Sequence, residues 1–268
     1  MKILHLAPLA LISSALSAGG SILMLDFGST EVTGDTRLNS PYHTAAGAGF
    51  TDVGWNRVER ADIPTGLVYS NGTAATGVTV NLGVAPASGA TTLVALGSVP
   101  GSSSGLGTVV STGIYASPSV GRDGIFGVAG QSLGVQVTGL APGIYEIFII
   151  GRNTNISNSI AKSYVGTGVA GVDFDFSGLT PVTINYTNLT STSSWIEGVN
   201  YSRHTITLGA GDGLNIATQG TDSDSQFRGF LNSIQIVQQV PEPSTAAFLS
   251  TLLLFALRRG RACPSLCR

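Results

Sequence analysis

Short segments in which apolar and polar residues alternate recur along this chain, and they constrain its fold more than any other feature. Residues 78–82 (Val-Thr-Val-Asn-Leu), 133–137 (Leu-Gly-Val-Gln-Val) and 204–208 (His-Thr-Ile-Thr-Leu) alternate with a period of two. This is the period of a β-strand with one buried and one solvated face. Between residues 20 and 238, no ten-residue stretch repeats with the 3.6-residue period of an amphipathic helix. The pattern therefore predicts an all-β body.

Turns rich in glycine, serine, asparagine and aspartate separate the expected strands. Residues 144–150 are the most apolar segment, and we expect this strand at the centre of a sheet. Because no helices are available to cover a parallel sheet, the segments indicate an antiparallel β-sandwich, formed as one domain by residues 20–238. Residues 100–107 are interpreted as a long loop, with a domain boundary as the alternative. The remaining expected strands are residues 22–27, 172–176, 183–187 and 230–237.

Residues 1–19 have the features of a secretory signal peptide. Lys2 supplies a positive charge, residues 3–16 are mostly apolar, and residues 15–17 (Ala-Leu-Ser) fit a small-x-small cleavage site. A transmembrane anchor is the alternative, but the apolar run is short and Pro8 interrupts it. We therefore expect the body to be exported.

Residues 240–268 differ in composition from the body. Two prolines flank a glutamate, an apolar run follows at residues 246–257, and a basic cluster and a short tail (residues 262–268) end the chain. The prolines favour an extended segment before the apolar run. As a helix this run would span only ~18 Å, against a hydrocarbon core of ~30 Å. It is short for a stable membrane anchor, although arginines can reach back to the membrane interface.

This order of parts, over residues 240–261, resembles the PEP-CTERM sorting signal of exported bacterial proteins. The residues that match the pattern are Pro241, Glu242, Pro243, Arg258, Arg259 and Arg261. The resemblance implies processing by an exosortase and transient insertion of the short C-terminal hydrophobic helix into the inner membrane. It also implies delivery to the cell envelope or extracellular matrix and association with exopolysaccharide. An ordinary C-terminal membrane anchor is the alternative.

The charge and cysteine content limit the partners and the means of stabilisation. Charged residues make up 10% of the chain, against ~25% in a typical soluble protein, and Lys162 is the only lysine between residues 20 and 240. A body without clustered positive charge is not suited to bind nucleic acid. Cys263 and Cys267 both lie in the tail, so we expect the body to be stabilised by its core without disulfides.

Short stretches of the body resemble two kinds of β domain. Residues 139–145 (Gly-Leu-Ala-Pro-Gly-Ile-Tyr) and the closing strand at residues 231–236 look like jelly-roll domains of the galactose-binding type. Residues 25–29 (Leu-Asp-Phe-Gly-Ser), followed by Gly49-Phe50 and Gly54-Trp55, are similar to the N-terminal β module of some secreted polysaccharide esterases. These resemblances imply a jelly-roll-like sandwich. They leave a secreted polysaccharide hydrolase or esterase as an alternative function.

Three patterns that can carry enzyme chemistry also have a simpler structural interpretation. Residues 101–105 fit G-x-S-x-G, but a nucleophile elbow needs a helix after it, whereas a strand-like run follows here and His204 is the only downstream histidine. Residues 166–171 fit G-x-G-x-x-G, but no helix follows to meet a pyrophosphate, so we interpret them as a turn. Asp173 and Asp175 alternate with phenylalanines, and we expect them on the solvent face of a sheet rather than as a catalytic pair.

Metal-binding residues are sparse in the sequence. His43 and His204 are far apart, and neither has a partner four residues away. Asp222 and Asp224 offer oxygen ligands for a structural calcium ion, but their loop lacks the glycine and closing glutamate of an EF-hand. A solvated loop is the alternative, and no other cofactor is expected.

Trp55, Trp195 and Tyr201 are candidates for binding carbohydrate. Asparagine, arginine or glutamate lies beside each tryptophan, and such side chains can bind sugar hydroxyls while the aromatic ring stacks on the sugar. The alternative is that these aromatic residues cap the core. We therefore predict a non-enzymatic, exported envelope or matrix protein, with a carbohydrate-binding module as the first alternative.

Overall fold

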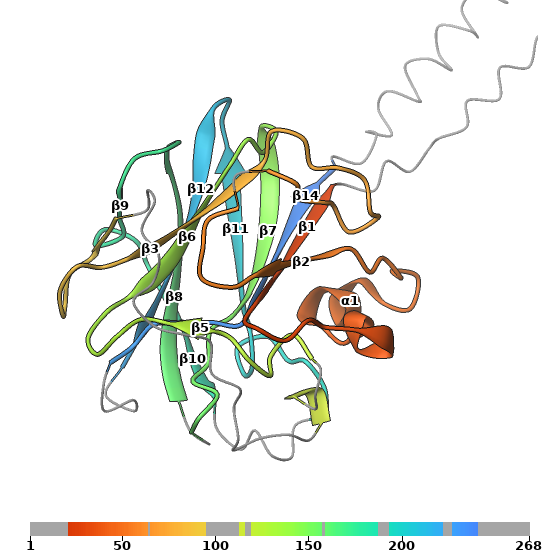
Figure 1. Ribbon diagram of the computed structural model, residues 1–268, viewed down its shortest axis with the longest axis horizontal. Helices are drawn as coiled ribbons and strands as arrows, with labels where there is room; N and C mark the ends of the chain where they lie inside the picture. Colours follow the sequence, from red (N-terminus) through yellow and green to blue (C-terminus); the bar gives the residue numbers. More distant parts are fainter. Residues whose placement is uncertain are drawn as a thin grey trace, which may run out of the picture. The chain divides into compact units, whose positions relative to one another are not determined.

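A computed structural model describes residues 21–63, 65–94, 113–115, 119–156, 159–186, 193–221 and 227–240 (Figure 1). Within it, Ser21–Gln239 form one compact unit. Several predicted features lie outside the described residues. They are the signal peptide at residues 1–19, the G-x-S-x-G loop, Asp222 and Asp224, and the sorting segment from Pro241 onward.

Two five-stranded sheets form an all-β sandwich, as the alternating segments predict. The first sheet has the order β11 (Ser202–Leu208), β7 (Gly143–Ile150), β14 (Ser233–Gln239), β1 (Ile22–Phe27) and β2 (Trp55–Val58). The second has the order β10 (Val182–Tyr186), β8 (Ser159–Val169), β12 (Asp212–Gly220), β6 (Leu133–Thr138) and β3 (Thr79–Val84). Two short ladders join β13 (Phe230–Leu231) to β5 (Ile125–Phe126), and β4 (Thr92–Leu93) to β9 (Phe174–Asp175).

The main core lies between the two sheets. One face of β1, β7 and β14 contributes alternate apolar residues, and one face of β3, β6 and β12 meets them. The expectation that residues 144–150 form a central strand is confirmed, because β7 lies between β11 and β14 and is buried on both faces over Ile147–Ile150. The alternate residues are Leu23, Leu25, Ile147, Ile149, Ile234 and Ile236 on one sheet, and Val80, Leu82, Val135, Val137, Leu214 and Ile216 on the other.

The outer face of the first sheet is covered by the helical segment between β1 and β2, which comprises η1 (Gly34–Leu38) and α1 (Pro41–Ala46) (Figure 1). Ser40 caps α1, and its hydroxyl accepts hydrogen bonds from the Gln235 amide at 2.8 Å and from His43 N–H at 3.4 Å. The Gln235 side chain also accepts from Tyr42 N–H at 2.9 Å. One glutamine of the central strand β14 thus fixes α1 against the sheet. Among the described residues, no helix has the length and apolar character needed to cross a membrane.

The structure differs from the sequence-based expectation in two places, one in the direction of a strand pair and one in the position of a turn. Among the described residues, every pair of strands is antiparallel except β1 and β2, which run parallel because the helical segment carries the chain back across the sheet. The G-x-G-x-x-G stretch was expected to be a turn, but Gly166 and Gly168 lie in β8 and the turn begins only at Ala170. A Cβ at Gly168 would lie 2.5 Å from Asn215 Nδ2 on the paired strand β12. The glycine there therefore serves strand packing.

Candidate functional site

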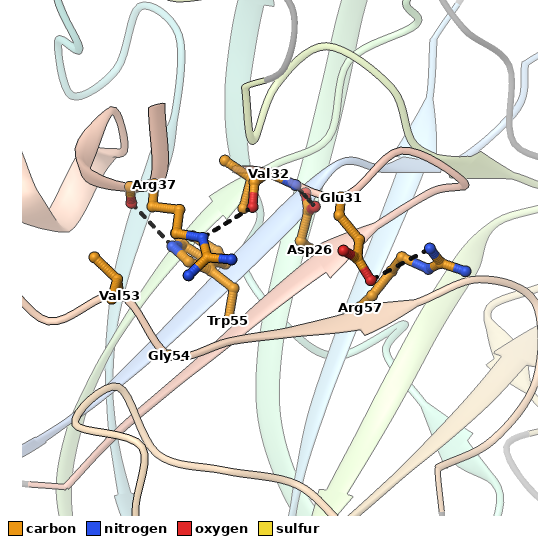
Figure 2. A pocket seen from close by; sticks show the side chains of 8 residues that line it. All are labelled: Asp26, Glu31, Val32, Arg37, Val53, Gly54, Trp55 and Arg57. Carbon is orange, nitrogen blue, oxygen red and sulfur yellow. Dashed lines mark hydrogen bonds and ion pairs between the residues drawn. The ribbon is translucent and has the colours of Figure 1, made fainter. Parts of the chain in front are cut away.

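A hollow of about 270 Å³ opens at the edge of the first sheet, where β2 follows the helical segment (Figure 2). We call it the Trp55 hollow. The parallel pairing of β1 with β2 sets Asp26 opposite Arg57 and Met24 opposite Trp55, so the two strands deliver charged and aromatic groups to one place. The lining residues are Asp26, Glu31, Val32, Arg37, Val53, Gly54, Trp55 and Arg57.

The Trp55 side chain is half-buried and held in a defined position. Its indole N–H donates to the carbonyl oxygen of Arg37 at 3.0 Å (Figure 2). The Arg37 Nε–H in turn donates to the carbonyl oxygen of Val32 at 3.3 Å. These two bonds tie the segment after β1 to the edge strand. The indole is therefore ordered before any ligand arrives, which lowers the entropy that binding would cost.

Arg57 and Glu31 provide exposed donors and acceptors at the other side of the hollow. Their side chains form an ion pair at 3.4 Å (Figure 2). Arg57 also pairs with Glu59. Exposed pairs of this kind contribute only ~0–1 kcal/mol to stability. Their hydrogen-bonding capacity is therefore available to a polar ligand at little cost to the fold.

Asp26 is the buried carboxyl of this hollow. Its Oδ2 accepts from Val32 N–H at 3.2 Å, and none of the described residues donates to its Oδ1. Burial raises the pKa of Asp26 well above its usual value, and the nearby charge of Asp123 raises it further. Asp123 accepts from Thr30 N–H at 2.8 Å, and burial raises its pKa as well. A protonated Asp26 can donate a hydrogen bond as well as accept one.

A second hollow, of about 350 Å³, adjoins the first. The two share Arg37, Val53 and Gly54 in their walls. A Cβ at Gly54 would lie 2.4 Å from the carbonyl oxygen of Tyr69 and 2.7 Å from that of Ser70, so only glycine fits where the chain passes this backbone. The remaining wall is polar, and Ser70 donates to the Asp52 carboxylate at 2.7 Å. Its other lining residues are Thr51, Asp52, Ser70, Asn71 and Gly72.

Of the three aromatic residues predicted to bind sugar, only Trp55 lines this site. Trp195 is 5% exposed, donates from its indole to Asn39 Oδ1 at 2.8 Å and packs edge-on to Tyr115. Tyr201 is 6% exposed and packs against Phe148 with ring centroids 5.8 Å apart. Neither offers an open ring face for stacking, and both belong to the cluster that covers the outer face of the first sheet.

Two serine–histidine contacts occur within the described residues, and sequence reasoning anticipated neither. Ser163 Oγ lies 2.9 Å from His204 Nε2, between β8 and β11, and burial lowers the pKa of His204 to about 4. Ser40 Oγ lies 2.6 Å from His43 Nδ1, beneath α1. Both serines are at most 5% exposed. The contacts therefore serve packing between elements rather than attack on a substrate.

The carboxylates expected on the solvent face lie there. Asp173 and Asp175 are exposed, while Phe174 and Phe176 are buried. The Ser177 N–H donates to Asp175 at 2.9 Å, and hydrogen bonds from Ser177 lower the pKa of Asp175. A lowered pKa is the opposite of what a general acid needs. In the part of the chain that the structure describes, no group of three or more histidine, cysteine, aspartate or glutamate side chains could hold a metal ion.

Sequence reasoning missed Asp26, Glu31 and Arg37 as members of the site. One signal was present, because Asp26 is the only charged residue in an otherwise apolar strand at residues 22–27. An aspartate in such a strand must find a polar partner or a hollow. Glu31 and Arg37 carry no such signal, because they lie in a polar segment. Only the folded structure shows that this segment lies beside β2.

No protein-family model and no curated protein sequence matches this chain. Among solved structures it is similar to protein YXIM from Bacillus subtilis, with 14% identity and a TM-score of 0.32 over 83% of this chain and 41% of that one. It is also similar to TmCBM61 in complex with β-1,4-galactotriose, with 12% identity and a TM-score of 0.24 over 44% of this chain and 72% of that one. A third similar structure is the insecticidal crystal protein Cry2Aa, with 15% identity and a TM-score of 0.21 over 44% of this chain and 17% of that one. The chain thus spans less than half of the length of YXIM.

Proposed function

We propose that this protein is an exported, non-enzymatic component of the cell envelope or extracellular matrix, and that its β-sandwich binds polysaccharide at the Trp55 hollow. The observation that carries the binding proposal is the combination of an ordered indole and charged side chains in a hollow at a sheet edge. A sugar ring has an apolar face and a rim of hydroxyls. An indole suits the apolar face, and arginine and carboxylate groups suit the hydroxyls.

The adjoining hollows favour a chain of sugar units over a single one. They share one wall at Arg37, Val53 and Gly54, so a ligand that fills one can continue into the other. Asp52 and Asn71 add acceptors and donors in the second hollow. Volumes of about 270 and 350 Å³ are near the lower end of the ~300–1,000 Å³ common for small-molecule sites. Each hollow therefore suits a small part of a polymer.

Retention on polysaccharide tests the binding proposal. Insoluble or extracellular polysaccharide should retain the wild-type protein, and Trp55→Ala should lose most of this retention because it removes the stacking surface. Phe227→Ala is the matched control, since Phe227 is an exposed aromatic residue (48%) that lines neither hollow. Unfolding midpoints of both variants show whether they remain folded. Failure of the wild type to be retained, or equal retention of the folded Trp55→Ala variant, would refute the proposal.

The location of the protein is proposed from the sequence features at its two ends. The features of a signal peptide at residues 1–19 and the PEP-CTERM-like segment at residues 240–261 support export, transient inner-membrane insertion and processing by an exosortase. The jelly-roll-like character of the sequence between them is in keeping with an extracellular role beside exopolysaccharide.

Mass spectrometry of the mature C-terminus tests the sorting proposal. We expect a C-terminus upstream of the Arg258 cluster in the producing cell. Replacing Pro241, Glu242 and Pro243 by alanine should leave the chain unprocessed. Recovery of a mature wild-type chain that ends at Arg268 contradicts the proposal.

A further inference from the structure

Arg152 is a fully buried arginine directly after the central strand β7. It is 0% exposed, and its Nε–H donates to the carbonyl oxygen of Gly121 at 2.9 Å. The guanidinium carbon lies 4.0 Å from the centroid of the Tyr115 ring, so the group stacks on the aromatic face. No described residue accepts a hydrogen bond from its two terminal nitrogens, NH1 and NH2. The edge of the guanidinium that best binds oxygen pairs is therefore unoccupied by protein groups.

Other polar groups near Arg152 share this lack of partners. The Nε and NH1 of Arg122 are buried without an acceptor, and so are the Asn153 Nδ2 and the hydroxyls of Tyr115 and Ser119, among the residues described. They are close in the fold. Tyr115 contacts the Arg152 guanidinium, Arg122 N–H donates to the Ser119 carbonyl at 3.0 Å, and Asn153 follows Arg152. Orphaned donors are rare in folded proteins, and a cluster of them indicates a missing acceptor.

The positive charge here also lacks a counter-charge within the described residues. The ionisable groups that act on Arg152 are Tyr115, Tyr186 and Arg122, and no carboxylate is among them. Burial raises the pKa of both tyrosines, which keeps them neutral. Asp123 follows Arg122 in sequence, but its carboxylate accepts from Thr30 N–H at 2.8 Å. A buried cation without a partner strongly destabilises a folded protein. Water can accept its hydrogen bonds but cannot neutralise its charge.

We propose that the Arg152 and Arg122 side chains bind an oxyanion that presents two oxygens, a carboxylate or a tetrahedral sulfate or phosphate group. Stacking on Tyr115 fixes the plane of the Arg152 guanidinium, and NH1 and NH2 then match two oxygens in the bidentate arrangement that arginine favours. Arg122 lies in the connection that precedes β5, where it adds a second positive charge, and it is only partly buried. This site is separate from the Trp55 hollow, and the proposal does not depend on polysaccharide binding there.

Thermal unfolding of the whole protein at constant ionic strength tests this proposal. Sodium acetate, sodium sulfate or sodium phosphate replaces part of a sodium chloride background, and the unfolding midpoint is followed as each anion is titrated. We expect at least one oxyanion to raise the midpoint along a saturable curve. The response to acetate against sulfate and phosphate distinguishes a carboxylate site from a site for tetrahedral anions.

Three variants assign the response to this site. Arg152→Met removes the buried charge while keeping the length of the side chain, and it should abolish the saturable response. Arg122→Gln, at the partly buried arginine, should raise the half-saturating anion concentration at least tenfold. This variant provides the test if Arg152→Met does not fold. Arg203→Gln is the matched control, because Arg203 is paired with Glu146 and Glu197 at the surface, and it should respond as the wild type does. A wild-type midpoint independent of the oxyanions, or the same saturable response in Arg122→Gln, overturns the proposal.

Discussion

At the residue scale, Asp26 is a buried carboxyl whose folded environment disfavours its charge. Its raised pKa means that the folded protein retains a proton that the unfolded chain releases near the usual aspartate pKa of 3.8. The sign follows from linkage. Because the folded pKa lies above the unfolded one, stability is lost as the pH rises from the unfolded pKa through the folded pKa. At neutral pH Asp26 therefore destabilises the fold.

Asp26→Asn should raise the free energy of unfolding at pH 7. Asparagine keeps an acceptor for Val32 N–H and removes the burial of charge, so the free energy of unfolding should rise at the pH values where the unfolded Asp26 is ionised. Urea unfolding from pH 3.5 to 8 measures the difference in the free energy of unfolding between the variant and the wild type, and this difference should vanish towards pH 4. Asp35→Asn, at an exposed aspartate in η1, is the control and should change little. A loss of stability at pH 7 in Asp26→Asn would contradict the cost assigned to the buried charge of Asp26.

His204 gives the opposite dependence on pH. Its folded pKa of about 4 lies below the usual value of 6.5, because the ring is buried between the sheets beside Ser163. The contribution of His204 to stability is complete above the unfolded pKa and is lost as the pH falls from 6.5 through 4. The loss is at most ~1.4 kcal/mol per pH unit for this one group.

His204→Gln should therefore flatten the acid limb of the stability profile. Glutamine can keep a hydrogen bond to Ser163 and does not titrate, so the difference from the wild type should grow steadily between pH 6.5 and 4. Chemical unfolding at intervals of half a pH unit measures the slope. Parallel profiles for the two proteins would show that folding does not lower the pKa of His204.

The residue scale also shows where sequence reasoning succeeds and fails. Trp55 and Trp195 carry the same signal, a tryptophan with polar neighbours in a turn-rich stretch. They differ only in what the rest of the chain lays over them. Asn39 and Tyr115, both more than 75 positions away in sequence, enclose Trp195, whereas the segment that holds Trp55 leaves a hollow beside it. Exposure of an aromatic side chain depends on such long-range contacts, which no local pattern contains.

At the element scale, the period of two locates strands that have one buried face and misses those that do not alternate. It predicts β3, β6, β10 and β11 to within a few residues, whereas β1, β7 and β14 were predicted as apolar segments at residues 22–27, 144–150 and 230–237. β8 and β12 are interior strands of the second sheet, yet glycine, serine, threonine and asparagine interrupt their apolar residues. At Gly168 a Cβ would meet the Asn215 side chain of the paired strand at 2.5 Å, and at Gly166 it would meet the Leu179 side chain at 2.8 Å. The parallel β1–β2 pair depends on the path of the helical segment, and no local sequence pattern predicts it.

The two sides of β7 allow a matched prediction within one strand. Ile147 is 0% exposed in the core between the sheets, and Ile144, three positions earlier, is 48% exposed. Ile147→Ala should cost about 2–5 kcal/mol of unfolding free energy, from the lost burial and the cavity left behind. Ile144→Ala should stay within about 0.5 kcal/mol of the wild type. Denaturant unfolding measures both, and similar costs for the two variants would contradict the burial described for this strand.

At the scale of the whole molecule, the first sheet depends on a strand from the end of the body. β14 lies between β7 and β1, pairs with both, and contributes Ile234 and Ile236 to the core. The Gln235 on its outer face holds α1 through Ser40. The N-terminal strand, the helical segment and hence the Trp55 hollow therefore all require β14. The complete sheet cannot form until the chain has been made as far as Gln239.

Truncation on either side of β14 should give two different proteins. A chain that ends at Asn232 loses the central strand, so β1 has no antiparallel partner, and we expect no cooperative unfolding transition. A chain that ends at Val240 keeps every strand that the structure describes, and we expect it to unfold cooperatively near the wild-type midpoint, since Ser21–Gln239 form one compact unit. Near-ultraviolet circular dichroism during heating measures both. Cooperative unfolding of the shorter chain would show that the sheet closes without β14, and loss of cooperativity in the longer one would show that the body needs the segment after Val240.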